Sequence, residues 1–584
     1  MVDVAKLIES VSGLRQRRAT PLVLELDLTE GVVEETPQDP ISQLKAMRRV
    51  RLNDTLDGIR AGAADPRVSA LVVKVGGQPI GMAVVQELRA ALEEFTATGK
   101  PVIAWTESFG DFGPGNLPYY LAAACTEIVL QPSGGVGLTG LRVVNPFFRD
   151  ALDRLGVEYE AATRYEYKSG PNQMTERGFT EAHREATGRI LESLTEQIVH
   201  GIAEGRGLDR ERVRALIDRG PFMAEEALSE GLIDRTAYRD EIYSDIMERF
   251  RRTPQHNGDR GETLTPQLQY VGRYQRNRAL HSLPGQVRAV RRGADHIALI
   301  SGTGPILSGR TRRSPVGGGT TMGADSIAAA FRAARRDPHV RAVVFRVNSP
   351  GGSHVASDTI LREVRLTSSA GIPVVVSMGE VAGSGGYFVA LGADVIVAQP
   401  STLTGSIGVY IAKPVLTDLL GKIGVNTESI EEGEHAGMFS LDHRFTEAEW
   451  EHVNARLDHV YTDFTSKVAE GRGMSVERVH ELARGRVWTG QDACDNGLVD
   501  RLGGIDTAAA VAREQAGLPQ RAELRAYPRL NPLERLVPPE SSEDRSAALT
   551  QLRLSAWGPL ASASARLGLP ATGPLTMPGV WDIQ

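Results

Sequence analysis

Ser384 and Lys168 are the two residues whose types and surroundings could perform chemistry together. Ser384 lies in a run of small residues, Gly383–Tyr387 (GSGGY), between an apolar strand-like stretch and an apolar helix-like stretch. A serine hydroxyl becomes a nucleophile only when a base takes its proton, and the attacked carbonyl needs N–H donors for its oxyanion. Lys168, within Tyr165–Gly170 (YEYKSG), could be that base, because burial lowers a lysine pKa by up to ~3–5 pH units.

An internal repeat links these two residues. The segment 65–75 (DPRVSALVVKV) returns 272 positions later as 337–347 (DPHVRAVVFRV), and further matches follow at slightly shorter offsets. Moving back 268 positions from Ser384 leads to Asn116, and moving forward 268 positions from Lys168 leads to Ala436. One copy therefore offers a hydroxyl without an amine and the other an amine without a hydroxyl. The predicted site needs both copies.

Glycine turns supply candidate oxyanion donors. The amide of Gly385 follows Ser384 directly and opens a helix, whose N-terminus favours negative charge. The turn Asn348–Ser353 (NSPGGS) follows a predicted strand, and the first copy has a degraded version at 76–79 (GGQP). Ligands gather at the carboxyl ends of parallel strands, so both turns fall on the functional edge. The pattern is not GxSxG, because Ala382 stands two positions before the serine. Among 12 histidines none has an evident triad partner.

The elements that must position these residues alternate between strand and helix. Each copy opens with a strand, continues through a helix, and adds further strands separated by helices. This alternation predicts parallel βαβ units with right-handed crossovers, and hence an α/β fold with a tandem duplication. The predicted strands are 21–28, 70–75, 101–105 and 127–130 in the first copy, and 296–301, 342–347, 373–377 and 394–398 in the second; the helices between them are 82–97 and 355–369.

Five segments are predicted along the chain. The first is an N-terminal amphipathic helix over residues 1–20, which either docks on its own domain or contacts a membrane surface. The first domain follows over 21–249, then a linker over 250–295 rich in Arg, Gln, Asn, Pro and Gly. The second domain covers 296–517. The extension 518–584 is Pro- and Ser-rich in its first part and predicted to be partly mobile.

Composition excludes several classes of protein. The chain has 584 residues, 41% of them apolar, and a net charge of −7, which fits a soluble multidomain protein and gives no reason to expect nucleic acid as a partner. Cys125 and Cys494 lie far apart and form neither a zinc spacing nor a disulfide framework. We expect no metal and no cofactor. No segment reaches the ~18 consecutive apolar residues of a membrane-spanning helix.

Three motifs in order resemble signal peptide peptidase A (protease IV), in its long, duplicated bacterial form: 346–353 (RVNSPGGS), 378–387 (MGEVAGSGGY) and 403–409 (LTGSIGV). The resemblance covers about residues 21–517 and implies two ClpP/crotonase-like domains with a Ser–Lys dyad. It implies that Ser384 is the nucleophile, that Lys168 is the general base, and that Ser406 hydrogen-bonds the lysine. The amides of Gly352 and Gly385 match the oxyanion donors.

The resemblance also implies a function. Members of the family digest apolar peptides, above all released signal peptides, through an acyl-enzyme, and they assemble as homotetramers. Many long-form members begin with a transmembrane anchor, which this sequence lacks. We therefore expect a cytoplasmic enzyme, or one held peripherally at the inner face of the bacterial plasma membrane. Two alternatives stay open: a crotonase-like acyl-CoA enzyme that uses the glycine amides for a thioester enolate, and a catalytically idle, membrane-associated scaffold.

Overall fold

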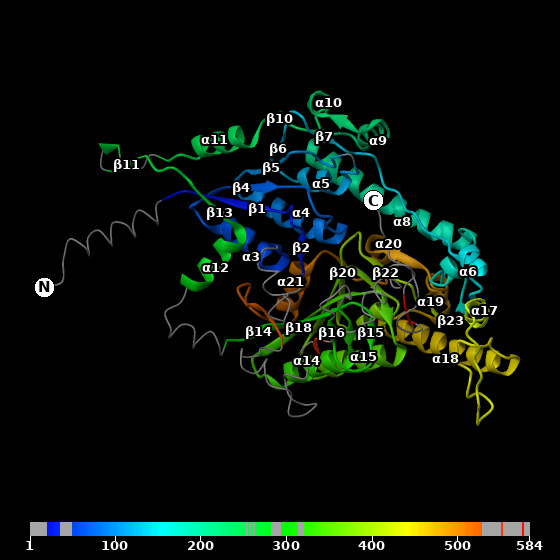
Figure 1. The fold of residues 1–584 in the computed structure, drawn as a ribbon. Helices are drawn as coiled ribbons and strands as arrows, with labels where there is room; N and C mark the ends of the chain where they lie inside the picture. Colours follow the sequence, from blue (N-terminus) through cyan, green and yellow to red (C-terminus); the bar gives the residue numbers. More distant parts are fainter. Residues whose placement is uncertain are drawn as a thin grey trace. The chain divides into compact units, whose positions relative to one another are not determined.

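The computed structural model of the chain divides into two compact units that are not continuous in sequence (Figure 1). Unit 1 combines Met1–Leu141 with Thr195–Arg292, and unit 2 combines Arg142–Leu194 with Gly293–Gln584. The predicted boundaries at 21–249 and 296–517 follow the sequence repeat and remain a prediction. The predicted helix over 1–20 and most of the extension 518–584 lie outside the described residues. These are 20–34, 50–111, 113–252, 255–256, 259–260, 263–281, 294–313, 320–527, 551–552 and 575–576.

Unit 1 contains a six-stranded parallel sheet. Its inner strands are almost wholly buried and rich in Val, Ile and Leu, as expected of a sheet covered on both faces. The strand order is β10 (Arg235–Thr236), β6 (Glu127–Leu130), β5 (Val102–Thr106), β4 (Val68–Lys74), β1 (Leu22–Asp27) and β13 (Gln267–Tyr270).

Helices cover both faces of this sheet (Figure 1). On one face α3 (Leu52–Ala64) packs against α4 (Met82–Ala97) and α12 (Val271–His281). On the other face α11 (Arg239–Arg249) inserts Ile242 and Ile246 into a buried cluster with residues of β1, β4 and β5. The predicted linker 250–295 therefore contains structural elements, because β13 and α12 belong to it.

Unit 2 repeats this arrangement with an eight-stranded sheet. Helices α14 (Ala324–Arg336) and α15 (His354–Ser369) lie along one side and α21 (Ile505–Gln515) along the other (Figure 1). The strand order is β24 (Val487–Thr489), β22 (Leu403–Gly405), β20 (Val374–Gly383), β18 (Val340–Ser349), β14 (His296–Thr303) and β26 (Leu524–Ala526), with β21 (Val395–Ala398) between β20 and β25 (Arg501–Leu502). All these pairs are parallel except β22 with β24.

The duplication reaches individual hydrogen bonds. The Tyr119 hydroxyl donates to the carbonyl of Leu232 at 2.6 Å, and the Tyr387 hydroxyl donates to the carbonyl of Leu498 at 2.8 Å. Similarly, in each unit a half-buried arginine pairs with an aspartate, and the aspartate accepts a hydrogen bond from a strand amide. The sets are Arg206, Asp234 and Ile128, and Arg472, Asp500 and Ile396. The predicted α/β fold with a tandem duplication and parallel sheets is confirmed.

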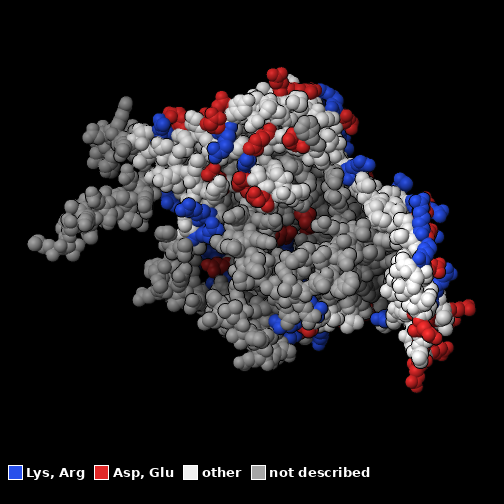
Figure 2. All heavy atoms as spheres, in the orientation of Figure 1, with Lys and Arg blue, Asp and Glu red and all other residues white. Residues whose placement is uncertain are grey.

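The segment 423–446, between α17 (Thr417–Lys422) and α18 (Glu447–Arg472), forms a projecting tip of unit 2 and is coloured yellow in Figure 1. Figure 2 shows Asp and Glu gathered at its end, whereas both signs are interspersed over the rest of the face in view. Ile430 and Phe439 are exposed in this segment, beside acidic residues such as Glu431. The end of this segment therefore combines exposed apolar side chains with acidic ones.

Helices of membrane-crossing length and hydropathy are absent from the part of the chain that the structure describes.

Candidate active site

Ser384 lies where β20 ends and the short helix α16 (Gly385–Phe388) begins. Its backbone has φ 54° and ψ −114°, a conformation that non-glycine residues rarely adopt. The serine amide donates to the carbonyl of Gly405 at 2.8 Å, and the serine carbonyl accepts from the amide of Phe388 at 2.9 Å. Such strain persists only where the surroundings determine the conformation, and it is found most often at functional sites.

Lys168 reaches Ser384 on an arm formed by the segment 142–194. In this arm β8 (Glu158–Arg164) pairs antiparallel with β23 (Val409–Val415), and α18 packs across both strands. Lys168 follows β8, and its amide donates to the carbonyl of Tyr165 at 3.1 Å. The lysine of the first repeat therefore lies in unit 2, together with the serine of the second repeat and within one chain.

The amine of Lys168 is held among three oxygen atoms. Its Nζ lies 3.0 Å from Ser384 Oγ, 3.0 Å from Ser406 Oγ and 3.0 Å from the carbonyl oxygen of Ser406. The lysine side chain is 1% exposed, and both serines are fully buried. Burial lowers the pKa of Lys168 well below the ordinary value of 10.5, because the ammonium loses its hydration and no other cause opposes that loss. A neutral amine here has a lone pair free to accept a proton.

Ser406 also has a positive φ, 50°, and lies directly after β22. Its amide donates to the carbonyl of Arg486 at 2.7 Å. Among the described residues only one other non-glycine residue, Arg484, has a positive φ, and its carbonyl accepts from the amide of Tyr165. All of the described residues with this strain therefore lie in or beside the Lys168 site.

Two glycine amides lie together beside Ser384. Gly352 belongs to β19 (Gly351–Gly352), which follows β18, and its φ is 156°. A Cβ on Gly352 would lie 2.1 Å from the carbonyl oxygen of Ile306, so the position requires glycine. A Cβ on Gly385 would lie 3.1 Å from the amide nitrogen of Gly352, which places the two predicted oxyanion donors side by side.

In unit 1 the position that corresponds to Ser384 is occupied by an asparagine, Asn116. Asn116 begins α5 (Asn116–Ala122), and its Oδ1 accepts from the amides of Thr139 and Gly140 while its Nδ2 donates to the carbonyl of Gly140. All of these hydrogen bonds are internal to the unit. Asn116 therefore has a structural position where the second copy has a serine.

The turn Arg484–Arg486 was not predicted from the sequence. It packs against the backbone of Lys168. The amide of Gly485 donates to the carbonyl of Ile407 at 2.8 Å, and Gly485 has φ 89°. A Cβ at this position would lie 2.4 Å from the backbone nitrogen of Lys168. No sequence signal could have found this residue, because its partner is distant in the chain and glycine turns are common.

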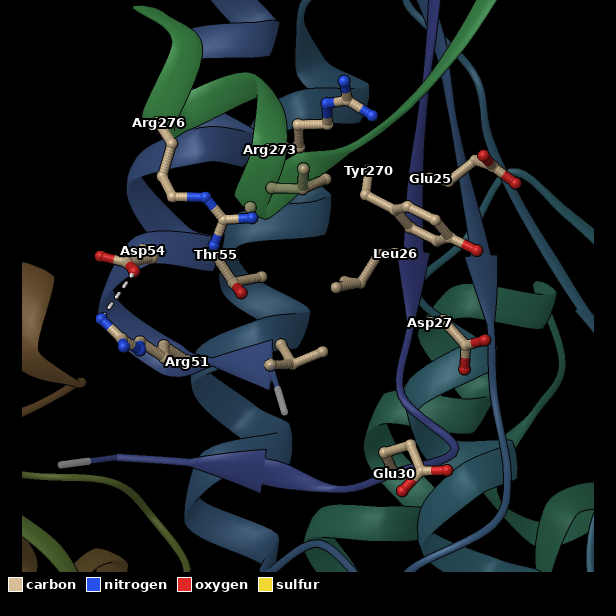
Figure 3. Close-up of a pocket in the computed structure, with 13 residues that line it drawn as sticks. Glu25, Leu26, Asp27, Glu30, Arg51, Asp54, Thr55, Tyr270, Arg273 and Arg276 are labelled. Carbon is tan, nitrogen blue, oxygen red and sulfur yellow. Dashed lines mark ion pairs between the residues drawn. The ribbon is translucent and has the colours of Figure 1, made fainter. Parts of the chain in front are cut away.

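An open cavity of about 350 Å³ lies in unit 1, at the carboxyl end of β1 (Figure 3). Arg51 and Asp54 form an ion pair at 3.7 Å on one side, and Arg276 of α12 extends toward Thr55 beside this pair, whereas Arg273 points away from it. Acidic and basic side chains both line this cavity, so its charge selects no single class of ligand. Groups of three or more metal-ligating side chains are absent among the described residues.

Comparison with known proteins identifies the family. The model named peptidase family S49 matches residues 94–251 and 367–519, once in each copy. The chain is 31% identical over 458 residues to the chloroplastic serine protease SPPA of Arabidopsis thaliana, a match that covers 78% of this chain and 64% of that protein. It is 32% identical to protease 4 of Salmonella typhi, covering 80% and 72% of the two chains, and 29% identical to protease 4 of Haemophilus influenzae, covering 82% and 75%.

Among solved structures, a ClpP1 mutant from Listeria monocytogenes covers 38% of this chain at 13% identity with a TM-score of 0.24, which is too weak a likeness to carry an argument. The family is shown instead by the sequence relatives and by the family match in both copies. The chain therefore belongs to peptidase family S49, the family of serine peptidases that includes its relatives named protease 4.

Proposed function

We propose that this serine peptidase of family S49 cuts apolar peptides, released signal peptides among them, through a Ser384–Lys168 dyad. The observation that carries the proposal is the 3.0 Å separation of Lys168 Nζ from Ser384 Oγ, in buried surroundings that lower the pKa of the amine. A general base must lie within hydrogen-bond reach of the proton it takes, and its pKa must lie near the working pH. Lys168 meets the first condition, and burial moves its pKa down from 10.5, the direction that the second condition requires.

The reaction proceeds in two halves. Ser384 Oγ attacks the peptide carbonyl carbon while its proton passes to Lys168 Nζ, and the oxyanion receives hydrogen bonds from the amides of Gly352 and Gly385. The C–N bond then breaks, and the leaving amine takes the proton from Lys168. Water next attacks the acyl-enzyme and gives a proton to Lys168. When the second intermediate collapses, the carbon–Oγ bond breaks and that proton returns to Ser384.

Ser406 orients the base in this proposal. Its hydroxyl and carbonyl oxygens occupy two directions around Lys168 Nζ. A neutral amine has two N–H donors and one lone pair, so donation of both N–H groups to Ser406 turns the lone pair toward the Ser384 hydroxyl.

The other proposals for this chain extend the same function. We propose assembly as a homotetramer and a location in the cytoplasm or at the inner face of the plasma membrane. The acyl-CoA alternative leaves the paired Ser384 and Lys168 without a task, and an idle scaffold would not need a desolvated amine beside a strained serine. Membership of a peptidase family also favours the peptidase over both.

A fluorophosphonate probe tests the dyad, because it reacts with an activated serine. The wild-type chain should be labelled at Ser384, and Ser384→Ala should abolish labelling. Lys168→Met should strongly slow labelling while thermal unfolding stays cooperative. Ser475→Ala, which changes a helix-capping serine of α19 (Val476–Leu482), is the matched control and should label normally. Undiminished labelling of Ser384→Ala would refute the assignment of the nucleophile.

A further inference from the structure

The C-terminal extension returns to the candidate active site. Its strand β28 (Leu575–Thr576) pairs antiparallel with β19, so that Leu575 lies opposite Gly352 and Thr576 opposite Gly351. A second stretch, β27 (Gln551–Leu552), pairs with β16 (Arg312–Arg313) in the same unit. Two separate parts of the extension are therefore added to unit 2 as strands.

The pairing uses the edge of β19 that a substrate would need. On one side β19 pairs with β15 (Ile306–Leu307), and β28 occupies the other side. Strand β28 also lies beside β23, which follows Ser406 in the chain. An extended peptide commonly binds by adding a strand to an exposed sheet edge, where main-chain hydrogen bonds hold it. A peptide held on β19 would have its backbone beside Gly352, one of the two proposed oxyanion donors.

The composition of the segment matches the proposed substrates. Residues 551–584 contain three charged side chains, Arg553, Arg566 and Asp582, whereas the shorter stretch 528–550 contains seven. The rest of 551–584 is rich in Leu, Ala, Ser and Gly. Pro574 and Pro578 flank the paired residues, and because proline lacks an N–H they confine ladder pairing to the few residues between them.

We infer that the segment around Leu575–Thr576 is a built-in ligand of the active site, which competes with substrate peptides for β19. The inference rests on the proposed function, because it takes β19 as the strand that binds substrate. A ligand tethered to the same chain acts at a high effective concentration, even though a two-residue pairing is weak by itself. Competition of this kind raises the apparent KM and leaves kcat unchanged. With β28 paired to β19, the structure has Gly351, Gly352 and Ser384 all buried, as expected when a ligand covers the site.

The test replaces both paired residues in the full chain, as Leu575→Pro with Thr576→Pro. Adjacent pairs in an antiparallel ladder alternate between hydrogen-bonded and non-bonded, so removing both N–H groups removes the ladder in either register. Hydrogen exchange of Gly351 and Gly352, measured in a Ser384→Ala background, should become faster. With Ser384 intact, the apparent KM for a short apolar peptide should fall several-fold at constant kcat.

A synthetic peptide of residues 571–584 provides the control. Added to the double variant, it should slow exchange at Gly351 and Gly352 again and raise the apparent KM. The same peptide with prolines at positions 575 and 576 should do neither. Equal exchange rates at Gly351 and Gly352 in the variant and parent chains would overturn the inference. Since exchange needs no turnover, this failure is distinguishable from a failure of the peptidase function, which would appear as absent labelling at Ser384.

Discussion

Ser384 and Ser406 both have a positive φ, 54° and 50°, and each places its Oγ 3.0 Å from the same amine of Lys168. Each serine directly follows a strand of one sheet, β20 or β22, and these two strands are paired in parallel. The sheet thus sets the separation of the two hydroxyls, and the lysine enters between them on a separate arm. The proposed nucleophile and the proposed orienting residue therefore depend on one rigid element.

Replacing Ser406 by glycine should separate its hydroxyl from its backbone. Glycine tolerates the φ of 50° and keeps the carbonyl that lies 3.0 Å from Lys168, so the Ser406→Gly variant loses only the hydroxyl. Loss of one hydrogen bond of about 1.4 kcal/mol should lower kcat about tenfold with little change in KM. Steady-state kinetics on an apolar peptide measure the effect. Wild-type kcat in Ser406→Gly would remove this hydroxyl from the mechanism.

The rate should depend on pH through Lys168. Because burial holds the pKa of this lysine well below 10.5, activity should rise with pH along a single limb whose midpoint also lies well below 10.5. Below that midpoint the amine is protonated and cannot accept the serine proton. The pH profile of kcat/KM measures the midpoint. A profile that rises only near 10.5 would contradict a desolvated base.

Stability should depend on pH through the same residue, with a sign that follows from linkage. The pKa of Lys168 is lower in the folded state than in the unfolded state, so the unfolded chain binds more protons between the two values. This contribution to the free energy of unfolding is largest above about 10.5 and falls as the pH is lowered toward the folded pKa. Lys168→Met removes it. Thermal unfolding from pH 6 to 10 should therefore show a steeper rise for the wild type, and equal slopes would contradict the prediction.

Much of the fold could be predicted because its patterns are local. The helix over Met82–Ala97 has the predicted ends, and β6 and β21 lie at or within one residue of their predicted positions. The repeat also indicated which residues to pair, since Ser384 and Lys168 each lack a counterpart in the other copy. The compact units could not be predicted, because β8 pairs with β23 across a long separation in sequence and carries 142–194 into unit 2. The strand β28 was equally hidden, since three residues between prolines carry no strand signal.

Gly485 supplies a last prediction, on the packing around the base. Its φ is 89°, and a Cβ there would lie within 2.4 to 2.6 Å of the backbone nitrogen, Cα and Cβ of Lys168. These atoms belong to the backbone and the root of the side chain, so relief of the clash must move the lysine. A displacement of 1 Å at the base can lower a rate about 10²-fold. Gly485→Ala should therefore lose most of its kcat.

Gly473 is the matched control for this variant. It ends α18 in the left-handed conformation at φ 61°, and a Cβ there would meet no atom within 4 Å. Gly473→Ala carries the conformational strain without the clash, so it should lose about 1–2 kcal/mol of stability and keep its kcat. Comparing kcat with the free energy of unfolding in both variants separates general strain from displacement of Lys168. Equal loss of kcat in the two variants would show that contact between Gly485 and Lys168 has no special effect on the base.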